Sequence, residues 1–262
     1  MMNEKEVNKS SLRQKSDHLQ PAQLFSIVMP AYNEDDVIEK TLIDLISHLD
    51  KSDFQYEIVV INDGSTDQTE AILTKISALY DVIKHVNNDG PGGYGHAIRK
   101  GLDVYQGDAV VIVTSDGSDS PKDIVRYFEK IQEGYECAFG SRFMPGARVT
   151  GYPKFKLLVN RTANHFLSWL LKSQYNDFTN GFKCYRRHVI DDIQPLITGQ
   201  FNITIELSVS ATLSGWNYAV VPTDWIQRDA GDSSFYMNKL FKPYFLTLIY
   251  CMTRSYLKKI KR

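Results

Sequence analysis

The sequence predicts an α/β fold in which a mostly parallel sheet is flanked by helices. Short apolar runs alternate with helix-like segments from Leu24 to about Arg142. The runs are apolar throughout, as in strands that are covered on both faces. Polar, glycine-containing turns follow them, and the carboxyl ends of such strands are where α/β proteins bind ligands.

The composition indicates one sizeable domain without an overall field for nucleic acid. The chain has 262 residues, of which 43% are hydrophobic, and it carries 30 basic against 31 acidic side chains. That length can bury a substantial core, and balanced charge argues against nucleic-acid binding. The 3 cysteines are far apart and form no CxxC motif, which argues against a zinc site or a disulfide framework. We expect buried, reduced cysteines and a cytoplasmic protein.

The elements can be assigned in order along the chain. Apolar runs predict strands at 24–30, 56–61, 81–86, 108–114 and 136–142. Helical spacing of apolar residues predicts helices within 31–49, 66–80, 90–105 and 120–134. Ser120 and Pro121 are suited to the N-cap and the first position of the last of these helices.

The pattern changes after Arg142. We expect a long helix over 152–172, a turn, strand and helix over 177–193, and a further helix over 201–215. An extended segment follows at 217–229, and a loop at 230–243.

The two ends of the chain differ from the domain between them. Residues 1–21 are polar and lack the apolar core of a signal peptide, so we expect a disordered tail before a domain at 22–240. The apolar run Tyr244–Met252 is too short to span a membrane. Residues 241–262 predict a basic amphipathic helix on the membrane surface, with one face formed by Phe245, Ile249, Met252, Tyr256 and Ile260. A helix packed on the domain with a solvated basic end is the alternative.

Three turns could carry chemistry. In "VVINDGSTDQT", Asp63 can accept hydrogen bonds from a ribose or a base, although an N-capping turn would look the same. The loop "GPGGYGHAIRKG" is similar to a phosphate loop but has no Walker lysine, and helix packing or a flexible lid explains it as well. In "TSDGSDSP", Asp116 and Asp119 suit Mg²⁺ or Mn²⁺, with a helix-capping loop as the alternative.

Several motifs occur in a telling order: "SIVMPAYNE", "VVINDGSTDQT", the acidic turn before "SPKDI", then "FGSR", "DFTNGFKCYRR" and "DWIQRDAGDSSF". Together they resemble the GT-A glycosyltransferases of the dolichol-phosphate mannosyltransferase type, which are inverting enzymes. The resemblance extends from Leu24 to Lys239. It implies a GT-A fold, a Rossmann-like sheet flanked by helices, and a nucleotide-sugar donor.

The resemblance implies roles for residues on the donor side. Pro30, Tyr32, Glu34 and Asp63 would hold the base and ribose, and we place Gly95 with them. Asp116 would be catalytic, as the second carboxylate of the Asp-x-Asp metal motif. The sequence departs from the family at Thr114, which replaces the first Asp, at Ser118, which replaces a Gln, and at Asp119, which replaces a His. Either Asp119 compensates as a ligand of Mg²⁺ or Mn²⁺, or the metal depends on the donor diphosphate. Arg228, with Gly231 and Ser233, resembles the loop that closes over the diphosphate, and Arg228 would be the second catalytic residue, stabilising the departing diphosphate.

The resemblance also implies an acceptor site for a lipid phosphate. Arg142 matches the family's arginine, Lys156 stands at a basic position, and Arg161 lies on the same predicted helix; a solvated helix face is the alternative for the last two. Asn160 departs from the usual Ser. A phosphate oxygen is already anionic, so this transfer needs no general base. We therefore assign Asp177, Glu206 and Ser233 to ordering the site.

These observations predict an inverting glycosyltransferase that moves a sugar to polyprenyl or dolichyl phosphate at the cytoplasmic membrane face, with a membrane-embedded partner subunit as a further expectation. One alternative keeps the fold and the donor but uses a sugar hydroxyl as acceptor, with Asp177 as base. The other is a non-catalytic nucleotide-sugar-binding subunit, which the substituted Thr114 would favour.

Overall fold

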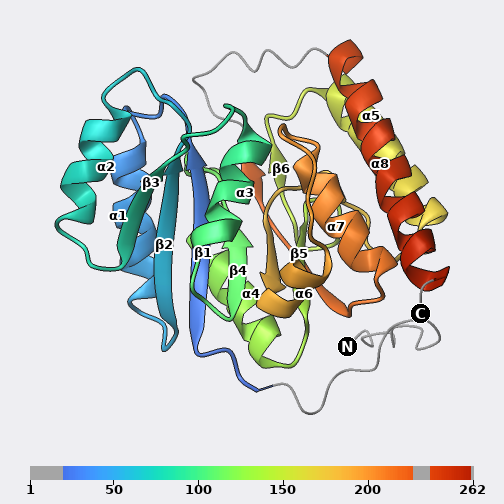
Figure 1. Ribbon diagram of the computed structural model, residues 1–262, viewed down its shortest axis with the longest axis horizontal. Coiled ribbons are helices and arrows are strands. Elements are labelled where there is room, and N and C mark those ends of the chain that lie inside the picture. The colour runs from blue at the N-terminus through green and yellow to red at the C-terminus, as the bar shows by residue number, and fades with distance from the viewer. Residues whose placement is uncertain (1–19, 227–236, 261–262) are drawn as a thin grey trace.

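The structure is a computed structural model that describes residues 20–226 and 237–260 (Figure 1). The predicted tail at 1–21 therefore lies almost wholly outside the described residues. So do Arg228, Gly231 and Ser233, whose expected roles at the donor diphosphate stay predictions.

A seven-stranded sheet forms the centre of the molecule, in the order β3-β2-β1-β4-β7-β5-β8. Its strands are parallel except β7, which runs antiparallel to both of its neighbours. The strands are β1 Leu24–Ala31, β2 Gln55–Asn62, β3 Ile83–Asn87, β4 Ala109–Ile112, β5 Cys137–Ser141, β7 Lys183–Arg186 and β8 Tyr218–Pro222. A small parallel pair, β6 Val149–Thr150 and β9 Trp225–Ile226, stands apart from this sheet.

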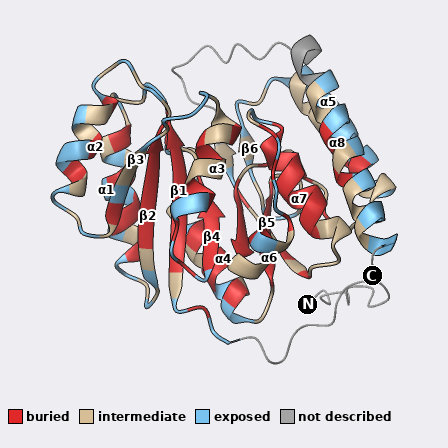
Figure 2. Ribbon diagram, viewed as in Figure 1, coloured by how far each residue is buried: buried red, intermediate tan, exposed pale blue. Residues whose placement is uncertain are grey.

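Helices cover both faces of the sheet and bury two separate cores (Figure 2). One core is built on α1 Ile38–Leu49, α2 Thr69–Ser77 and α4 Pro121–Gln132. The other receives α3 Tyr94–Val104, α5 Lys154–Leu170, α6 Arg187–Asp192, α7 Ile203–Leu213 and α8 Met237–Ile260. Every residue of β4, β5 and β7 is buried, which explains the continuous apolar run of β4.

The predicted α/β fold is confirmed, including the long helix, the β7–α6 unit and α7. Ser120 and Pro121 stand at the N-cap and the first position of α4, as predicted. Cys137, Cys184 and Cys251 are buried and free.

The start of the last helix was predicted wrongly. The loop expected over 230–243 is wrong from Met237 onward, where α8 begins, and its first part lies outside the described residues. The helix expected from residue 241 starts four residues earlier and continues through Pro243. A proline inside a helix removes one backbone donor. It interrupts the hydrogen-bond ladder of α8 without ending the helix, and the Thr247 hydroxyl donates to the Pro243 carbonyl at 2.8 Å.

Helix α8 is pinned to the domain through its basic residues. Lys258 forms an ion pair with Asp192 at 2.6 Å. The Arg254 guanidinium donates to backbone carbonyls that follow α6, among them that of Ile193. Leu248 and Cys251 are buried in the core. The face of α8 that carries these residues is therefore packed on the domain, as the alternative prediction stated.

The opposite face of α8 is apolar and exposed. Phe245, Ile249, Met252, Tyr256 and Ile260 share it, as the helical spacing predicted, and each is at least 39% exposed. Among the described residues, no helix has the length and apolar character that crossing a membrane would require.

Candidate active site

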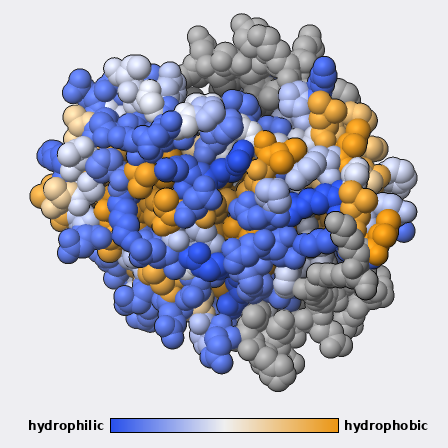
Figure 3. All heavy atoms as spheres, in the orientation of Figure 1, coloured by the Kyte–Doolittle hydropathy of each residue, from blue (hydrophilic) through white to orange (hydrophobic). Residues whose placement is uncertain are grey.

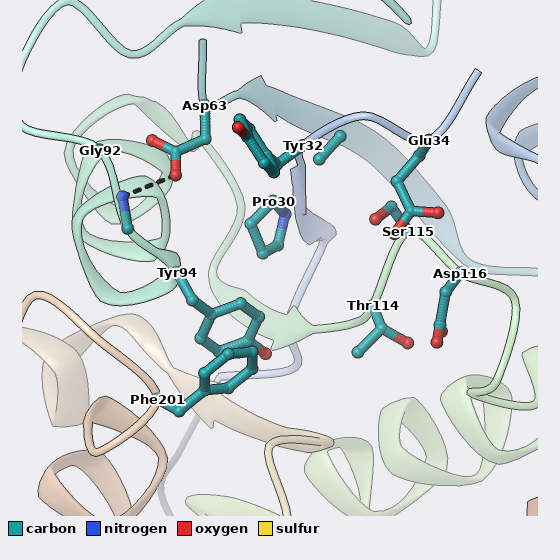
Figure 4. A pocket seen from close by; sticks show the side chains of 12 residues that line it. Pro30, Tyr32, Glu34, Asp63, Gly92, Tyr94, Thr114, Ser115, Asp116 and Phe201 are labelled. Carbon is teal, nitrogen blue, oxygen red and sulfur yellow. Dashed lines mark hydrogen bonds between the residues drawn. The ribbon is translucent and has the colours of Figure 1, made fainter. Parts of the chain in front are cut away.

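A cavity of about 580 Å³ opens at the carboxyl ends of β1, β2 and β4 (Figure 4). Its wall contains Pro30 near the end of β1, Tyr32 and Glu34 after β1, Asp63 after β2, and Asp116 after β4. These side chains are close together because parallel strands end at the same edge of the sheet. The structure thus brings four of the five predicted donor residues to one place, together with the predicted catalytic carboxylate.

Asp63 connects the β2 turn to the glycine-rich loop. Its Oδ1 accepts a hydrogen bond from the Asn88 side chain at 2.6 Å, and its Oδ2 accepts one from the Gly93 N–H at 2.7 Å. A carboxylate has about four acceptor sites, so these two bonds leave capacity for a ligand. The geometry favours a binding role over the plain N-capping turn, since neither bond belongs to α2.

The glycine-rich loop contributes Gly92, Gly93 and Tyr94 to the cavity wall. The predicted residue Gly95 lies one position further, in the first turn of α3, and its N–H donates to the Gly199 carbonyl at 3.0 Å. A Cβ on Gly95 would come within 2.6 Å of the Gly199 backbone, so only glycine permits this approach. Gly95 therefore seats the loop against the segment before α7.

The sequence reasoning did not single out Tyr94 and Phe201. Their rings stack at 4.5 Å between centroids with an interplanar angle of 15°, and both line the cavity. An aromatic residue inside a glycine-rich loop was the available signal for Tyr94. Nothing in the sequence indicated that Phe201 would meet it.

Glu206 holds the segment that carries Phe201. It is fully buried on α7, and its carboxylate accepts hydrogen bonds from the backbone N–H groups of Ile197 and Thr198 at 2.8 and 3.0 Å. The Thr198 hydroxyl also donates to it. This geometry agrees with the site-ordering role predicted for Glu206.

The acidic turn after β4 lies between two cavities. Asp116 and Thr114 line both the cavity of about 580 Å³, which we call the donor cavity after its predicted donor residues, and a neighbouring one of about 470 Å³. Asp119 lines only the second. Oδ2 of Asp119 accepts hydrogen bonds from the backbone N–H and the hydroxyl of Thr114 at 2.8 and 3.0 Å. Burial raises the pKa of the Asp119 carboxyl to about 7, with Asp116 adding to the effect and the Thr114 hydrogen bonds opposing it.

The donor set of this turn suits a hard divalent cation. Asp116 and Asp119 are two carboxylates on one turn, and Asp119 is tied to the position where the family has its first Asp. Mg²⁺ is commonly held by one or two carboxylates together with substrate phosphates. Within the described ranges, no cluster of three or more His, Cys, Asp or Glu side chains could hold a metal. Two carboxylates on one turn are compatible with such a cation, and a bound diphosphate would have to supply further ligands.

Arg142, the predicted acceptor residue, is paired with Asp177. The guanidinium donates through Nε and Nη2 to the two carboxylate oxygens at 2.8 and 2.7 Å. Burial of Arg142 opposes its charge, but the Asp177 carboxylate outweighs burial and raises the arginine pKa. Nη1 of Arg142 forms no hydrogen bond within the part of the chain that the structure describes.

Helix α5 brings Arg161, another predicted acceptor residue, close to Arg142. The Phe143 ring lies within cation–π distance of two guanidinium groups, at 5.3 Å from Arg142 and 5.7 Å from Arg161. Asn160 of α5 accepts a hydrogen bond from Thr179, which in turn accepts one from Arg142. Lys156 lies one turn before Asn160 on the same helix.

Comparison with known proteins identifies the class. The family model of glycosyl transferase family 2 matches residues 26–194. The chain therefore belongs to glycosyltransferase family 2, and it is a glycosyltransferase with the GT-A fold. The family resemblance found in the sequence is confirmed, because curated relatives include an enzyme of polyprenol phosphate.

Three relatives show where the chain lies within this family. It is 28% identical to the polyprenol monophosphomannose synthase of Mycolicibacterium smegmatis, over 82% of each chain. It is 29% identical to the glycosyltransferase AglD of Haloferax volcanii, but it spans only 32% of that longer protein. It is 30% identical to the uncharacterized glycosyltransferase YkcC of Bacillus subtilis, over 87% of this chain and 67% of YkcC.

Solved structures confirm the fold. Glucosyl-3-phosphoglycerate synthase from Mycobacterium tuberculosis, in complex with Mn²⁺, UDP and glucosyl-3-phosphoglycerate, superimposes with a TM-score of 0.68. The match covers 87% of this chain and 80% of that one, at 20% identity. The same synthase was also crystallised with Mn²⁺ and UDP-glucose.

Proposed function

We propose that this glycosyltransferase moves a sugar from a nucleotide diphosphate to a polyprenyl phosphate at a membrane surface. The observation that carries the proposal is the Arg142–Asp177 pair beside the acidic turn. Arg142 follows β5 and the acidic turn follows β4; these two strands run parallel with only β7 between them, so both segments lie at the carboxyl edge of the sheet. Nη1 of Arg142 has no hydrogen-bond partner among the described residues, and a guanidinium with this group available suits an anionic acceptor.

The donor would lie along the cavity with its base near Asp63 and Tyr32 and its diphosphate near Asp116. Mg²⁺ or Mn²⁺, held by Asp116 and Asp119, would supply positive charge to the departing diphosphate. The complexes of the mycobacterial synthase with Mn²⁺ and UDP-glucose support this choice of cofactor and donor class. Arg228 and Ser233 would close over the diphosphate, as the family resemblance implies.

The acceptor phosphate would face Arg142, Lys156 and Arg161. Its oxygen is already anionic and needs no base to attack the anomeric carbon. Asp177 is fully buried and both of its oxygens are bonded to Arg142. This supports an ordering role for Asp177 and weakens its candidacy as the base for a hydroxyl acceptor. The mannose synthase of M. smegmatis, which is named for a polyprenol product, supports a lipid acceptor.

The exposed apolar faces of two helices support a position on a membrane. On α5, Phe155, Leu158, Phe166 and Trp169 are between 51% and 74% exposed, and they lie on the side opposite the buried Asn164. The outer face of α8 is also apolar, and Figure 3 shows hydrophobic residues gathered on the side of the molecule where α8 lies. Lys154, Lys156 and Arg161 are on α5, so an anionic lipid surface would match its charge.

A transfer assay tests the proposal. The purified protein would be incubated with GDP- or UDP-sugars, Mn²⁺, and either polyprenyl phosphate or the matching polyprenol. We expect mass spectrometry to find one added hexose on the phosphate and none on the alcohol. Transfer to the alcohol, or to a sugar hydroxyl instead, would show that the proposed acceptor is wrong.

A further inference from the structure

One wall of the donor cavity is made by two aromatic rings from distant segments. Tyr94 stands at the start of α3 and Phe201 just before α7, and Figure 4 shows them stacked across the cavity from Asp63. Of the two, only Tyr94 carries a hydroxyl that can form a hydrogen bond with a ligand.

The position of Tyr94 is fixed from both sides. The Gly199 carbonyl accepts hydrogen bonds from the N–H groups of Gly95 and His96, at 3.0 and 3.2 Å. A Cβ on Gly93 or Gly95 would lie less than 3.0 Å from Gly199 or Gln200. The backbone on either side of Tyr94 is thus held against the segment that Glu206 anchors, and Phe201 holds the ring itself.

The hydroxyl of Tyr94 lies between two turns, those that carry Gly181 and Thr114. A Cβ placed on Gly181 would be 3.1 Å from this oxygen, so the hydroxyl lies against the turn that follows Asp177. In Figure 4 the phenol points toward the Thr114 side of the cavity. Among the described residues, no hydrogen bond of this hydroxyl is found. Burial, with the charges of Asp119 and Asp116, raises the Tyr94 pKa, so the group keeps its proton near neutral pH.

We propose that the Tyr94 hydroxyl donates a hydrogen bond to the leaving diphosphate of the donor; this inference rests on the proposed function. In the transfer, a phosphate oxygen of the acceptor forms a bond to the anomeric carbon. The bond from that carbon to the diphosphate breaks, and its electron pair stays on the diphosphate oxygen. Negative charge thus grows near the acidic turn, where a fixed, neutral donor stabilises it, and Tyr94 keeps its proton. Tyr94 is then a catalytic residue.

The substitution Tyr94→Phe removes the hydroxyl and keeps the stacked ring. We expect kcat to fall about 10-fold or more, while KM for the donor stays within about twofold, because the bond strengthens as charge develops. Tyr105→Phe is the matched control. Tyr105 is a buried tyrosine whose hydroxyl has no hydrogen-bond partner among the residues that the structure describes, and its ring is covered by Arg187. This control should keep the wild-type kcat.

Two results would overturn the inference. One is a Tyr94→Phe enzyme with kcat within about twofold of wild type. The other is a rise in donor KM at unchanged kcat, which would place the bond in the ground state. If the wild type transfers no sugar to any lipid phosphate, the proposed function itself has failed.

In that case, calorimetry with GDP, UDP and their nucleosides tests Tyr94 separately. The free diphosphates carry the charge that the leaving group develops, so Tyr94→Phe should weaken their binding about 5-fold or more and leave nucleoside binding unchanged. Equal affinity of the wild type and the variant for the diphosphates would refute the contact.

Discussion

Arg142 and Asp177, 35 residues apart in the chain, form a bidentate ion pair in which the carboxylate is fully buried. The Arg142 backbone N–H also donates to Asp177, at 2.9 Å. Three hydrogen bonds therefore fix the arginine at the end of β5. They also occupy both oxygens of Asp177, so this carboxylate orients the Arg142 guanidinium and is not an unpaired base.

This pair predicts a combined loss of stability and activity for Asp177→Asn. Removing one charge of a buried pair leaves the other uncompensated, which costs about 3–5 kcal/mol. We expect urea unfolding to show a loss of roughly 3 kcal/mol, together with a large loss of transfer. Asp192→Asn, which breaks the more exposed pair with Lys258, should cost about 1 kcal/mol or less. A variant with wild-type stability and no transfer would instead indicate a general base.

The acidic turn predicts a metal requirement. EDTA should abolish transfer and Mn²⁺ should restore it. Asp116→Asn should lower kcat about 100-fold, since a bound metal contributes several kcal/mol to a transition state. Asp119→Asn should lower it less, because an amide oxygen can still accept the Thr114 hydrogen bonds. Asp44→Asn is the control, because Asp44 lines the neighbouring cavity from α1. Activity that survives EDTA would contradict the prediction.

The outer face of α5 predicts binding to anionic vesicles. Phe155→Ser and Trp169→Ser should each weaken binding to vesicles that contain phosphatidylglycerol by roughly tenfold, since burying such a side chain stabilises by about 1.5–3 kcal/mol. Sedimentation of the protein with the vesicles measures this. Leu79→Ser is the control, because Leu79 is 66% exposed but follows α2, away from α5 in Figure 1. If the variants keep vesicle binding but change oligomeric state, the face contacts protein.

The environment of Lys183 predicts that the free energy of unfolding increases with pH. The lysine is fully buried, and its ammonium donates to the carbonyls of Phe178 and Asn180 in the Asp177–Gly181 turn. Burial lowers its pKa from 10.5 to about 7. Between these values the unfolded chain binds a proton that the folded protein lacks, so the free energy of unfolding rises with pH. Below about 7 both states are protonated, and the cost of burial is constant.

The measurement compares wild type with Lys183→Met by urea unfolding from pH 6 to 9. Above pH 7, the unfolding free energy of the wild type should rise relative to that of Lys183→Met by about 1 kcal/mol per pH unit. Lys183→Arg, whose guanidinium stays charged, should show no such rise. A difference that is flat with pH would refute the prediction.

Much of the fold and of the donor site could be predicted from local sequence. Apolar runs of strand length alternate with helical spacing up to Arg142, and parallel strands bring their polar ends together. This topology predicted that the polar turns would lie at one edge of the sheet, and the family resemblance then assigned Pro30, Tyr32, Glu34 and Asp63 to a site there; all four line one cavity.

Other features depend on pairings between distant segments. Phe201 reaches Tyr94 only because Gly199 approaches Gly95, and the composition of neither segment encodes that contact. The sequence also did not show that α8 has both an exposed apolar face and a packed basic face. Its apolar stripe could be predicted from helical spacing. The contacts of Arg254 with backbone carbonyls and of Lys258 with Asp192 could not, because they depend on where α6 ends.

The insertion of β7 between β4 and β5 has a consequence for biosynthesis. β4 pairs with β1 on one side, but its other neighbour is completed only at Arg186, 74 residues after the end of β4 at Ile112. Until that segment leaves the ribosome, the nascent sheet has an open, wholly apolar edge. Such an edge favours pairing with other chains. We therefore expect that chains stalled between β5 and β7 are the species that most need a chaperone.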